Sequence, residues 1–281
     1  MNWPTFNHEA MATTFQIAVA GMPTEYARQA TTAAFRELDR LTAELSRYVE
    51  SSDIASINRL GRDESTPIGE DTLQCLLIAV QISAATNRAF DPAYASTRNK
   101  GTAPDAPLFA IDSSSHQLTS LTTQLHLDLG AVGKGYALDR MADTLREWDI
   151  ESACLHSGGS TVLALAAPQE LEGWPVGLEA KTLFLSHRAL SGSGIAVKGR
   201  HLIDPRSGQP ASRMNLAWAL AETAAESDAL STAFFVMTDS EVAAFCATHP
   251  AFGAVISDVA GSLVSYGAAP AVISAPTKPA G

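Results

Sequence analysis

The 281-residue sequence has few charged residues, and that shortage excludes a class of partners. Asp, Glu, Lys and Arg together make up 17% of the chain, and the formal net charge is −11 at pH 7. A broad nucleic-acid surface needs clustered Lys and Arg to neutralise phosphates, so this balance argues against a nucleic-acid partner. A local positive pocket for a small anion stays compatible with the sequence.

Cysteine, long apolar runs and targeting signals are also scarce. The three cysteines, Cys75, Cys154 and Cys246, are widely spaced without a CxxC pair and predict neither a disulfide framework nor a zinc site. The absence of any run of about 18 apolar residues predicts no membrane span. The first residues show no secretory signal and no lipid-attachment cysteine, so we expect a cytoplasmic protein unless a leader precedes the numbering.

The sequence does contain enough apolar residues, 46%, to bury a substantial core. Helical periodicity is expected over residues 23–49, 52–60, 71–87, 227–237 and 239–248, and from about residue 132. Strand patterns are expected over residues 13–19, 108–118, 125–129, 153–155, 161–166, 174–179, 182–186, 188–191, 201–203, 216–221, 252–257 and 263–266.

These elements do not alternate strictly as βαβ units. We therefore predict an α+β fold of mixed β-sheets with packed helices. A single domain is expected over residues 1–267, followed by an Ala/Pro-rich tail over residues 268–281.

The stretch LDLGAVGKGYALDRMADTLREW places Asp128, three glycines and Lys134 where a strand is expected to turn into a helix. Glycines allow a sharp turn and a close approach of bare backbone. The first N–H groups of a helix and Lys134 favour a phosphate, and Asp128 can accept a hydrogen bond from a ligand. A purely structural alternative stays open, in which Asp128 caps the helix and Lys134 is solvated.

The stretch ESDALSTAFFVM places Asp228, Ser231 and Thr232 on one face of the expected helix. A carboxylate with hydroxyls one turn away suits a hard cation such as Mg²⁺, which prefers oxygen ligands. The structural alternative is an aspartate in the first turn that interacts with the helix dipole.

Three further stretches have both a functional and a structural interpretation. RAFDPAY puts Phe90 beside Asp91, which suits a planar ring or a capped loop. RHLIDPRSGQPA suggests ligand contacts near His201 or a structural hairpin. HSGGST brings backbone close to a partner or forms a tight turn, and we interpret His156 as a structural residue.

Taken in order, these stretches resemble the ApbE family, the FAD:protein FMN transferases. The matching pieces run from about residue 11 to 266 and are MATTFQI, SRYVESSDIASINRL, AFDP, DLGAVGKGYALDR, SGG, SGSG, HLIDPRSGQPA and ESDALSTAFFVM. The resemblance implies a two-lobed fold with a cleft that binds FAD and Mg²⁺. It implies transfer of FMN from FAD to a threonine or serine hydroxyl of an acceptor flavoprotein, with release of AMP.

The resemblance also implies roles for individual residues. Asp228 and Thr232 would be catalytic and would bind the metal, with Ser231 beside them and a backbone carbonyl ligand from Ala131. The implied FAD contacts are Met11, Ala89, Phe90, Asp91, Asp128, Lys134, His201 and Leu202.

The sequence departs from the family pattern at two places. Ser160 follows SGG where members commonly carry an acidic residue, and the segment between SGSG and HLIDP is short and lacks the usual aromatic residue. Three alternatives to transfer stay open: an Mg²⁺-dependent FAD pyrophosphatase that releases FMN and AMP, an FAD-binding protein without turnover, and a structural module.

Overall fold

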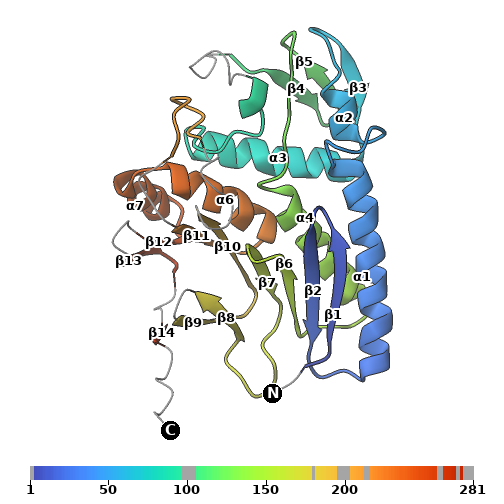
Figure 1. The fold of residues 1–281 in the computed structure, drawn as a ribbon, viewed down its shortest axis with the longest axis vertical. Helices are drawn as coiled ribbons and strands as arrows, with labels where there is room; N and C mark the ends of the chain where they lie inside the picture. Colours follow the sequence, from blue (N-terminus) through green and yellow to red (C-terminus); the bar gives the residue numbers. More distant parts are fainter. Residues whose placement is uncertain are drawn as a thin grey trace.

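The structure is a computed structural model, and it describes residues 3–96, 106–178, 181–194, 203–211, 216–257, 262–269 and 273–274. Within these residues, a large antiparallel sheet has the strand order β1-β2-β6-β7-β10-β11-β12-β13 (Figure 1). Its strands are β1 (Thr5–Ala10), β2 (Thr13–Val19), β6 (Ala153–Ser157), β7 (Thr161–Ala164), β10 (Arg188–Gly194), β11 (Leu216–Ala221), β12 (Gly253–Ser257) and β13 (Leu263–Gly267).

Two smaller sheets accompany the large one. One has the order β14-β9-β8 and consists of β8 (Trp174–Leu178), β9 (Lys181–Leu185) and β14 (Ile273–Ser274). The other has the order β3-β5-β4 and consists of β3 (Ser65–Pro67), β4 (Phe109–Asp112) and β5 (Gln117–Ser120). Strand β14 lies within the expected C-terminal tail, but its two residues pair with β9.

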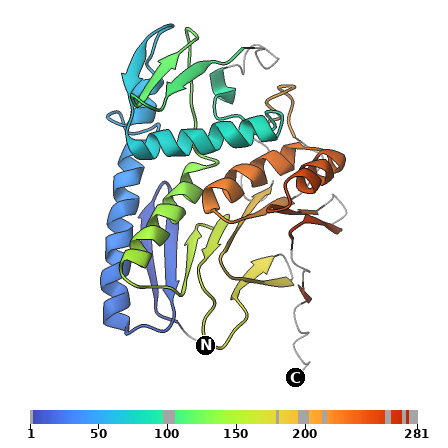
Figure 2. The same ribbon diagram turned by 180° about the vertical axis from the view of Figure 1, so that it is seen from behind.

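Helices α1 (Thr24–Leu45), α4 (Gly133–Glu147), α6 (Ala224–Val236) and α7 (Asp239–Thr248) cover one face of the large sheet, as Figure 2 shows from behind. Helices α2 (Asp53–Ile57) and α3 (Glu70–Ala85) lie toward the β3-β5-β4 sheet, where α2 contacts β3 and α3 packs on α6, and a short 3₁₀ turn spans Tyr94–Ser96. On α1, the buried residues recur at helical spacing, so one stripe faces the core and the other side remains polar. The main core lies between these helices and the sheet, and a second cluster joins the opposite face of the sheet to β8 and β9.

The architecture confirms the predicted α+β class and most of the expected elements. Predictions about four individual segments were wrong. Strands β1 and β3 were not expected, residues 108–118 contain two antiparallel strands, β4 and the start of β5, instead of one, and residues 125–129 do not form a strand. The sequence pattern there was misleading because Leu125, Leu127 and Leu129 are indeed buried alternately. However, the backbone N–H and C=O of Leu127 bond to the side chain of Asn58, so this segment has no neighbouring strand.

The apolar residues of the helix expected over residues 71–87 predict that Val80 lies on its buried side, but Val80 is 39% exposed on α3, so this prediction was wrong. The expected strand at residues 201–203 lies mostly outside the described residues; Ile203 forms an isolated bridge with Pro210. The turn predicted after it is present, because the carbonyl of Asp204 accepts from the backbone N–H of Gly208 at 2.8 Å.

Candidate functional site

The glycine-rich turn leads into α4 without a side-chain cap. The helix begins at Gly133, and its N-cap residue Val132 makes no capping hydrogen bond. Asp128 instead accepts a hydrogen bond from the backbone N–H of Gly130 at 2.9 Å and pairs with Arg47 at 2.9 Å. The structural alternative in which Asp128 caps the helix is therefore wrong, and one edge of its carboxylate remains at the surface.

Lys134 points inward rather than into solvent. Its side chain is 17% exposed, and its Nζ lies 3.8 Å from Oδ2 of Asp228. The same ammonium donates to the carbonyl of Gly130 at 2.5 Å. Thus Lys134 connects the glycine-rich turn to α6, and the alternative of a solvated lysine is wrong.

Gly135 allows α4 and α6 to approach each other closely. A Cβ atom at this position would lie 2.1 Å from the carbonyl oxygen of Ala224, which no side chain can tolerate. The backbone N–H of Gly135 donates to Oδ2 of Asp228 at 3.4 Å. The absence of a side chain at Gly135 is therefore what allows Lys134 to reach Asp228.

Asp228 is a fully buried carboxylate with long hydrogen bonds. It is 0% exposed, and besides Gly135 its partner is Ser191, whose hydroxyl donates to Oδ1 at 3.4 Å. Helix α6 begins at Ala224, so Asp228 lies beyond the first helical positions and the first-turn alternative is wrong. A buried carboxylate is costly unless it is well paired, and a cation beside it would lower that cost.

Hydroxyl groups from the sheet surround the same side of α6. The Ser193 hydroxyl lies 2.9 Å from that of Ser231 and 3.3 Å from that of Thr232. Ser191 contacts the hydroxyls of Thr161 at 3.0 Å and Ser231 at 3.3 Å. Ser231 is fully buried, whereas Thr232 retains some exposure. These oxygens form one connected cluster beside Asp228.

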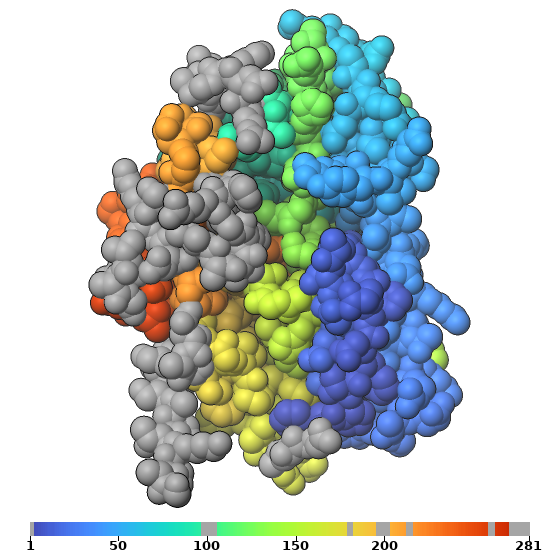
Figure 3. All heavy atoms as spheres, in the orientation of Figure 1, coloured from blue at the N-terminus to red at the C-terminus, as the bar shows by residue number. Residues whose placement is uncertain are grey.

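Two hollows adjoin this cluster and share a wall made by Asp128 and Gly130. The first has a volume of about 250 Å³ and is also lined by Ala89, Phe90, Asp91, Ala131 and Thr232. The second, of about 490 Å³, is also lined by Met11, Arg47, Tyr48 and Lys134. Figure 3 shows the chain near residue 130, in green, at the surface beside the N-terminal hairpin in dark blue.

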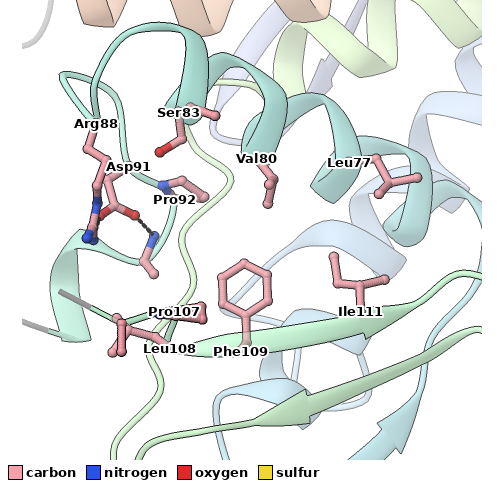
Figure 4. A pocket seen from close by; sticks show the side chains of 13 residues that line it. Leu77, Val80, Ser83, Arg88, Asp91, Pro92, Pro107, Leu108, Phe109 and Ile111 are labelled. Carbon is pink, nitrogen blue, oxygen red and sulfur yellow. Dashed lines mark hydrogen bonds and ion pairs between the residues drawn. The ribbon is translucent and has the colours of Figure 1, made fainter. Parts of the chain in front are cut away.

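The AFDP stretch has structural as well as lining roles. Asp91 pairs with Arg88 at 2.5 Å and accepts from the backbone N–H of Ala93 at 2.8 Å, as Figure 4 shows in a neighbouring hollow between α3 and β4. Phe90 is 3% exposed and belongs to the main core. Both residues also line the 250 Å³ hollow.

The structure therefore brings together most of the predicted site residues. His201 and Leu202 lie outside the described residues. His156 contacts Cys154 at 3.3 Å, and burial lowers its pKa, which agrees with a structural role. Sequence reasoning missed Ser191 and Ser193, although their alternation in SGSG places both on one face of β10.

Sequence reasoning also missed Asp139, for which the sequence contains no signal. Its carboxylate accepts hydrogen bonds from the backbone N–H groups of Ala224 and Ala225, at 2.8 and 2.9 Å. Burial raises the pKa of this carboxyl to about 7, although the two N–H groups lower it. A mid-helix aspartate is ordinarily solvated, so only the approach of α4 to α6 reveals this contact.

Two general properties of the described part of the chain bear on the site. No helix there is both long and apolar enough to cross a membrane. No group of three or more His, Cys, Asp or Glu side chains gathers in those ranges to hold a metal ion. A divalent ion near Asp228 would therefore take its remaining protein ligands from hydroxyls and backbone carbonyls.

Sequence comparison matches residues 11–256 to a family model described as the ApbE family. A 106-residue segment is 33% identical to an FAD:protein FMN transferase of Klebsiella pneumoniae (strain 342), covering 31% of this chain and 30% of that relative. A longer match to a protein of the same name and strain is 24% identical over 270 residues and covers 82% of this chain and 77% of the relative.

Structural comparison finds the same fold in solved proteins. A flavin transferase ApbE from Vibrio cholerae aligns with a TM-score of 0.78 at 20% identity, covering 93% of this chain and 96% of the other. The apo form of Pseudomonas stutzeri flavinyl transferase ApbE aligns with a TM-score of 0.81 at 22% identity, covering 94% of each chain.

Proposed function

Because the chain belongs to the ApbE family, we propose that it is a flavinyltransferase that moves FMN from FAD to a threonine or serine hydroxyl of an acceptor flavoprotein. The names of its relatives support this activity. The observation that carries the proposal is the contact between Lys134 of the glycine-rich turn and Asp228 of α6, at the edge of two hollows. The extent of the family match supports one transferase domain over residues 1–267.

The chemistry of the oxygen donors fits a divalent ion such as Mg²⁺. Asp228 offers a buried carboxylate whose hydrogen bonds are long, and Thr232 offers a hydroxyl that lines the smaller hollow. We propose that these two groups and the carbonyl of Ala131 hold the ion, with Ser231 beside them. When bound, Mg²⁺ supplies charge neutralisation at a pyrophosphate.

The remaining residues bind and orient FAD in this proposal. Lys134 offers a positive charge for a phosphate oxygen, and Asp128 has an exposed carboxylate edge that can accept from a ligand hydroxyl or N–H. Met11 lines the larger hollow, and Ala89, Phe90 and Asp91 line the smaller one. The acceptor hydroxyl oxygen attacks the FMN phosphorus, the pyrophosphate bond breaks, and AMP leaves while the hydroxyl proton is released.

The test is to incubate the purified protein with FAD, Mg²⁺ and a threonine-containing acceptor peptide. We expect a fluorescent flavinylated peptide and an equimolar amount of AMP. Asp228→Asn should lower the transfer rate by a factor on the order of 10²–10³, because it removes the carboxylate that would hold the ion that neutralises the reacting phosphate. Asp239→Asn, at the exposed start of α7, is the matched control and should keep full activity.

Other products would contradict transfer in distinct ways. Free FMN with AMP and an unlabelled peptide would indicate a pyrophosphatase in which water attacks instead of the hydroxyl. Intact FAD that remains bound would indicate a binding protein without turnover. A full transfer rate in Asp228→Asn would show that Asp228 has no role in the reaction.

A further inference from the structure

We propose that Asp139 is a positioning residue, which caps the N-terminus of α6 from α4 and thereby holds Asp228 in place beside Lys134. This inference rests on the flavinyltransferase function proposed above. It concerns a residue that touches neither of the two hollows beside Asp228, since Asp139 lines a separate polar hollow with Tyr136, Arg140 and Glu222.

Two different side chains accept hydrogen bonds from the first N–H groups of α6. Helix N-termini leave their first N–H groups without intrahelical partners, and the N-cap side chain usually satisfies one of them. Here Thr223, the N-cap residue, accepts from Glu226 at 3.3 Å. The two preceding N–H groups, of Ala224 and Ala225, donate to the two carboxylate oxygens of Asp139. The start of α6 is therefore fixed by another helix.

The cap lies one helical turn from the reactive contact. Asp139 follows Gly135 by one turn of α4, and Asp228 follows Ala224 by one turn of α6. The pair of contacts, Asp139 with Ala224 and Gly135 with Asp228, thus joins two antiparallel helices at successive turns. Because a helical turn is stiff, loss of the first contact should displace the second.

Both carboxylate oxygens are needed as acceptors, which makes the cap sensitive to protonation. Burial raises the pKa of Asp139, the two N–H groups lower it by less, and the negative charges of Asp143 on α4 and Glu226 on α6 raise it, so that the pKa is about 7. The same hollow is lined by further charged groups, namely Arg140 and Arg146 on α4, Glu70 and Asp71 on α3, and Glu222 before α6, and the buried thiol of Cys75 on α3 is also nearby. A protonated carboxyl has one good acceptor oxygen fewer, so the cap should weaken below about pH 7.

Ionisation of Asp139 has opposite effects on the stability of the protein and on the position of Asp228. The pKa of Asp139 in the folded protein lies above its ordinary value of 3.8, so the folded state binds the proton more tightly than the unfolded state does. The contribution of Asp139 to the free energy of unfolding therefore decreases as the pH rises from that ordinary value to about 7. The same ionisation completes the cap. Transfer activity should therefore increase over a pH range in which the contribution of Asp139 to stability decreases.

The experiment compares Asp139→Asn with two controls. Glu147→Gln removes a charge from an exposed position at the end of the same helix, and Thr223→Ala removes the cap of Glu226 without a titrating group. In Asp139→Asn we expect hydrogen exchange at the first turn of α6 to be about tenfold faster, the cost of one lost cap. We also expect the Mg²⁺ concentration for half-maximal transfer to rise about tenfold, as for other residues that orient metal ligands.

The pH dependence gives the decisive readout. The ratio of wild-type to Asp139→Asn activity should rise between pH 6 and pH 8, whereas the ratio for Thr223→Ala should stay flat. Glu147→Gln should keep the wild-type Mg²⁺ requirement. A constant ratio for Asp139→Asn, or unchanged exchange at the start of α6, would overturn the proposal.

One further measurement, on the wild-type protein, keeps the test informative. If Asp139→Asn does not fold, exchange in the wild-type protein, corrected for intrinsic rates, should still be faster at the start of α6 at pH 6 than at pH 8. Equal protection from exchange at pH 6 and pH 8 would contradict the proposal that Asp139 caps α6. Because exchange needs neither FAD nor Mg²⁺, it tests the cap even if the transferase assay fails.

Discussion

The two glycines in the first turn of α4 differ in what they allow. A Cβ at Gly135 would collide with the backbone of α6, whereas a Cβ at Gly133 would meet only Cβ of Leu129 at an ordinary 3.6 Å. The sequence pattern alone treats these glycines as equivalent. At the residue scale, the site therefore depends on one missing side chain, since it sets the separation between Lys134 and Asp228.

We expect Gly135→Ala to lower the free energy of unfolding by about 1–3 kcal/mol, the typical cost of overpacking a well-packed interior. Gly133→Ala should be neutral or stabilising by up to about 1 kcal/mol, because alanine favours the helix. Urea unfolding of both variants provides the measurement. Equal free energies of unfolding for the two variants would show that α6 can move away from a side chain at position 135 without loss of stability.

At the scale of elements, the helices that surround the site begin with different caps. Helix α6 has the N-cap Thr223 but also needs Asp139 of another helix for its first two N–H groups, whereas α7 carries its own capping box, in which Thr238 and Glu241 each accept from the other's backbone N–H. Glu241 also pairs with Arg206 at 2.7 Å. The start of α7 is thus determined locally, whereas the start of α6 depends on the tertiary structure.

For this reason, Thr238→Ala should lower the free energy of unfolding by about 1 kcal/mol, the usual cost of a lost N-cap. For a protein of this size, Tm should fall by roughly 2–4 °C. Transfer activity should be unchanged, because neither hollow beside Asp228 is lined by α7. Thr32→Ala, at an exposed position within α1, is the control and should leave Tm close to the wild-type value. An equal fall in Tm for both variants would contradict a specific cap.

At the scale of the whole molecule, Asp71 joins three helices. This residue of α3 accepts from Tyr136 of α4 at 2.7 Å and pairs with Arg40 of α1 at 2.5 Å. Burial raises the pKa of Asp71, but the Tyr136 hydroxyl and the Arg40 guanidinium lower it by more. Its pKa is therefore below the ordinary value, and its stabilising effect is lost as the pH falls through that lower pKa.

Tyr136→Phe should destabilise the protein at pH 7 by about 1.5–3 kcal/mol, the typical value for a hydrogen bond to a charged group. The difference from wild type should shrink as Asp71 becomes protonated, below its ordinary pKa of about 4. Urea unfolding at pH 7 and pH 3 measures this change. Tyr26→Phe, which removes a bond to the neutral carbonyl of Trp148, should show the same difference at both pH values. A pH-independent effect of Tyr136→Phe would refute the link to Asp71.

The expected elements were largely recovered because their patterns are local. Helix α7 and strands β2 and β11 were predicted with their observed bounds, because periodic apolar residues define α7 and β2 and a continuous apolar run defines β11. The failure at residues 125–129 has a physical reason. Alternating burial of leucines indicates an extended chain, but only the tertiary structure decides whether a strand or the side chain of Asn58 satisfies its backbone.

The sequence by itself determined the fold class, the family resemblance and the residue types of the candidate site. These properties depend on composition, local periodicity and the order of short motifs, which the linear chain contains. Only the tertiary structure decided that Lys134 contacts Asp228, that Gly135 has no space for a side chain, and that Asp139 caps α6. Such contacts join residues nearly a hundred positions apart, and their distances depend on how two helices pack, which no local pattern specifies.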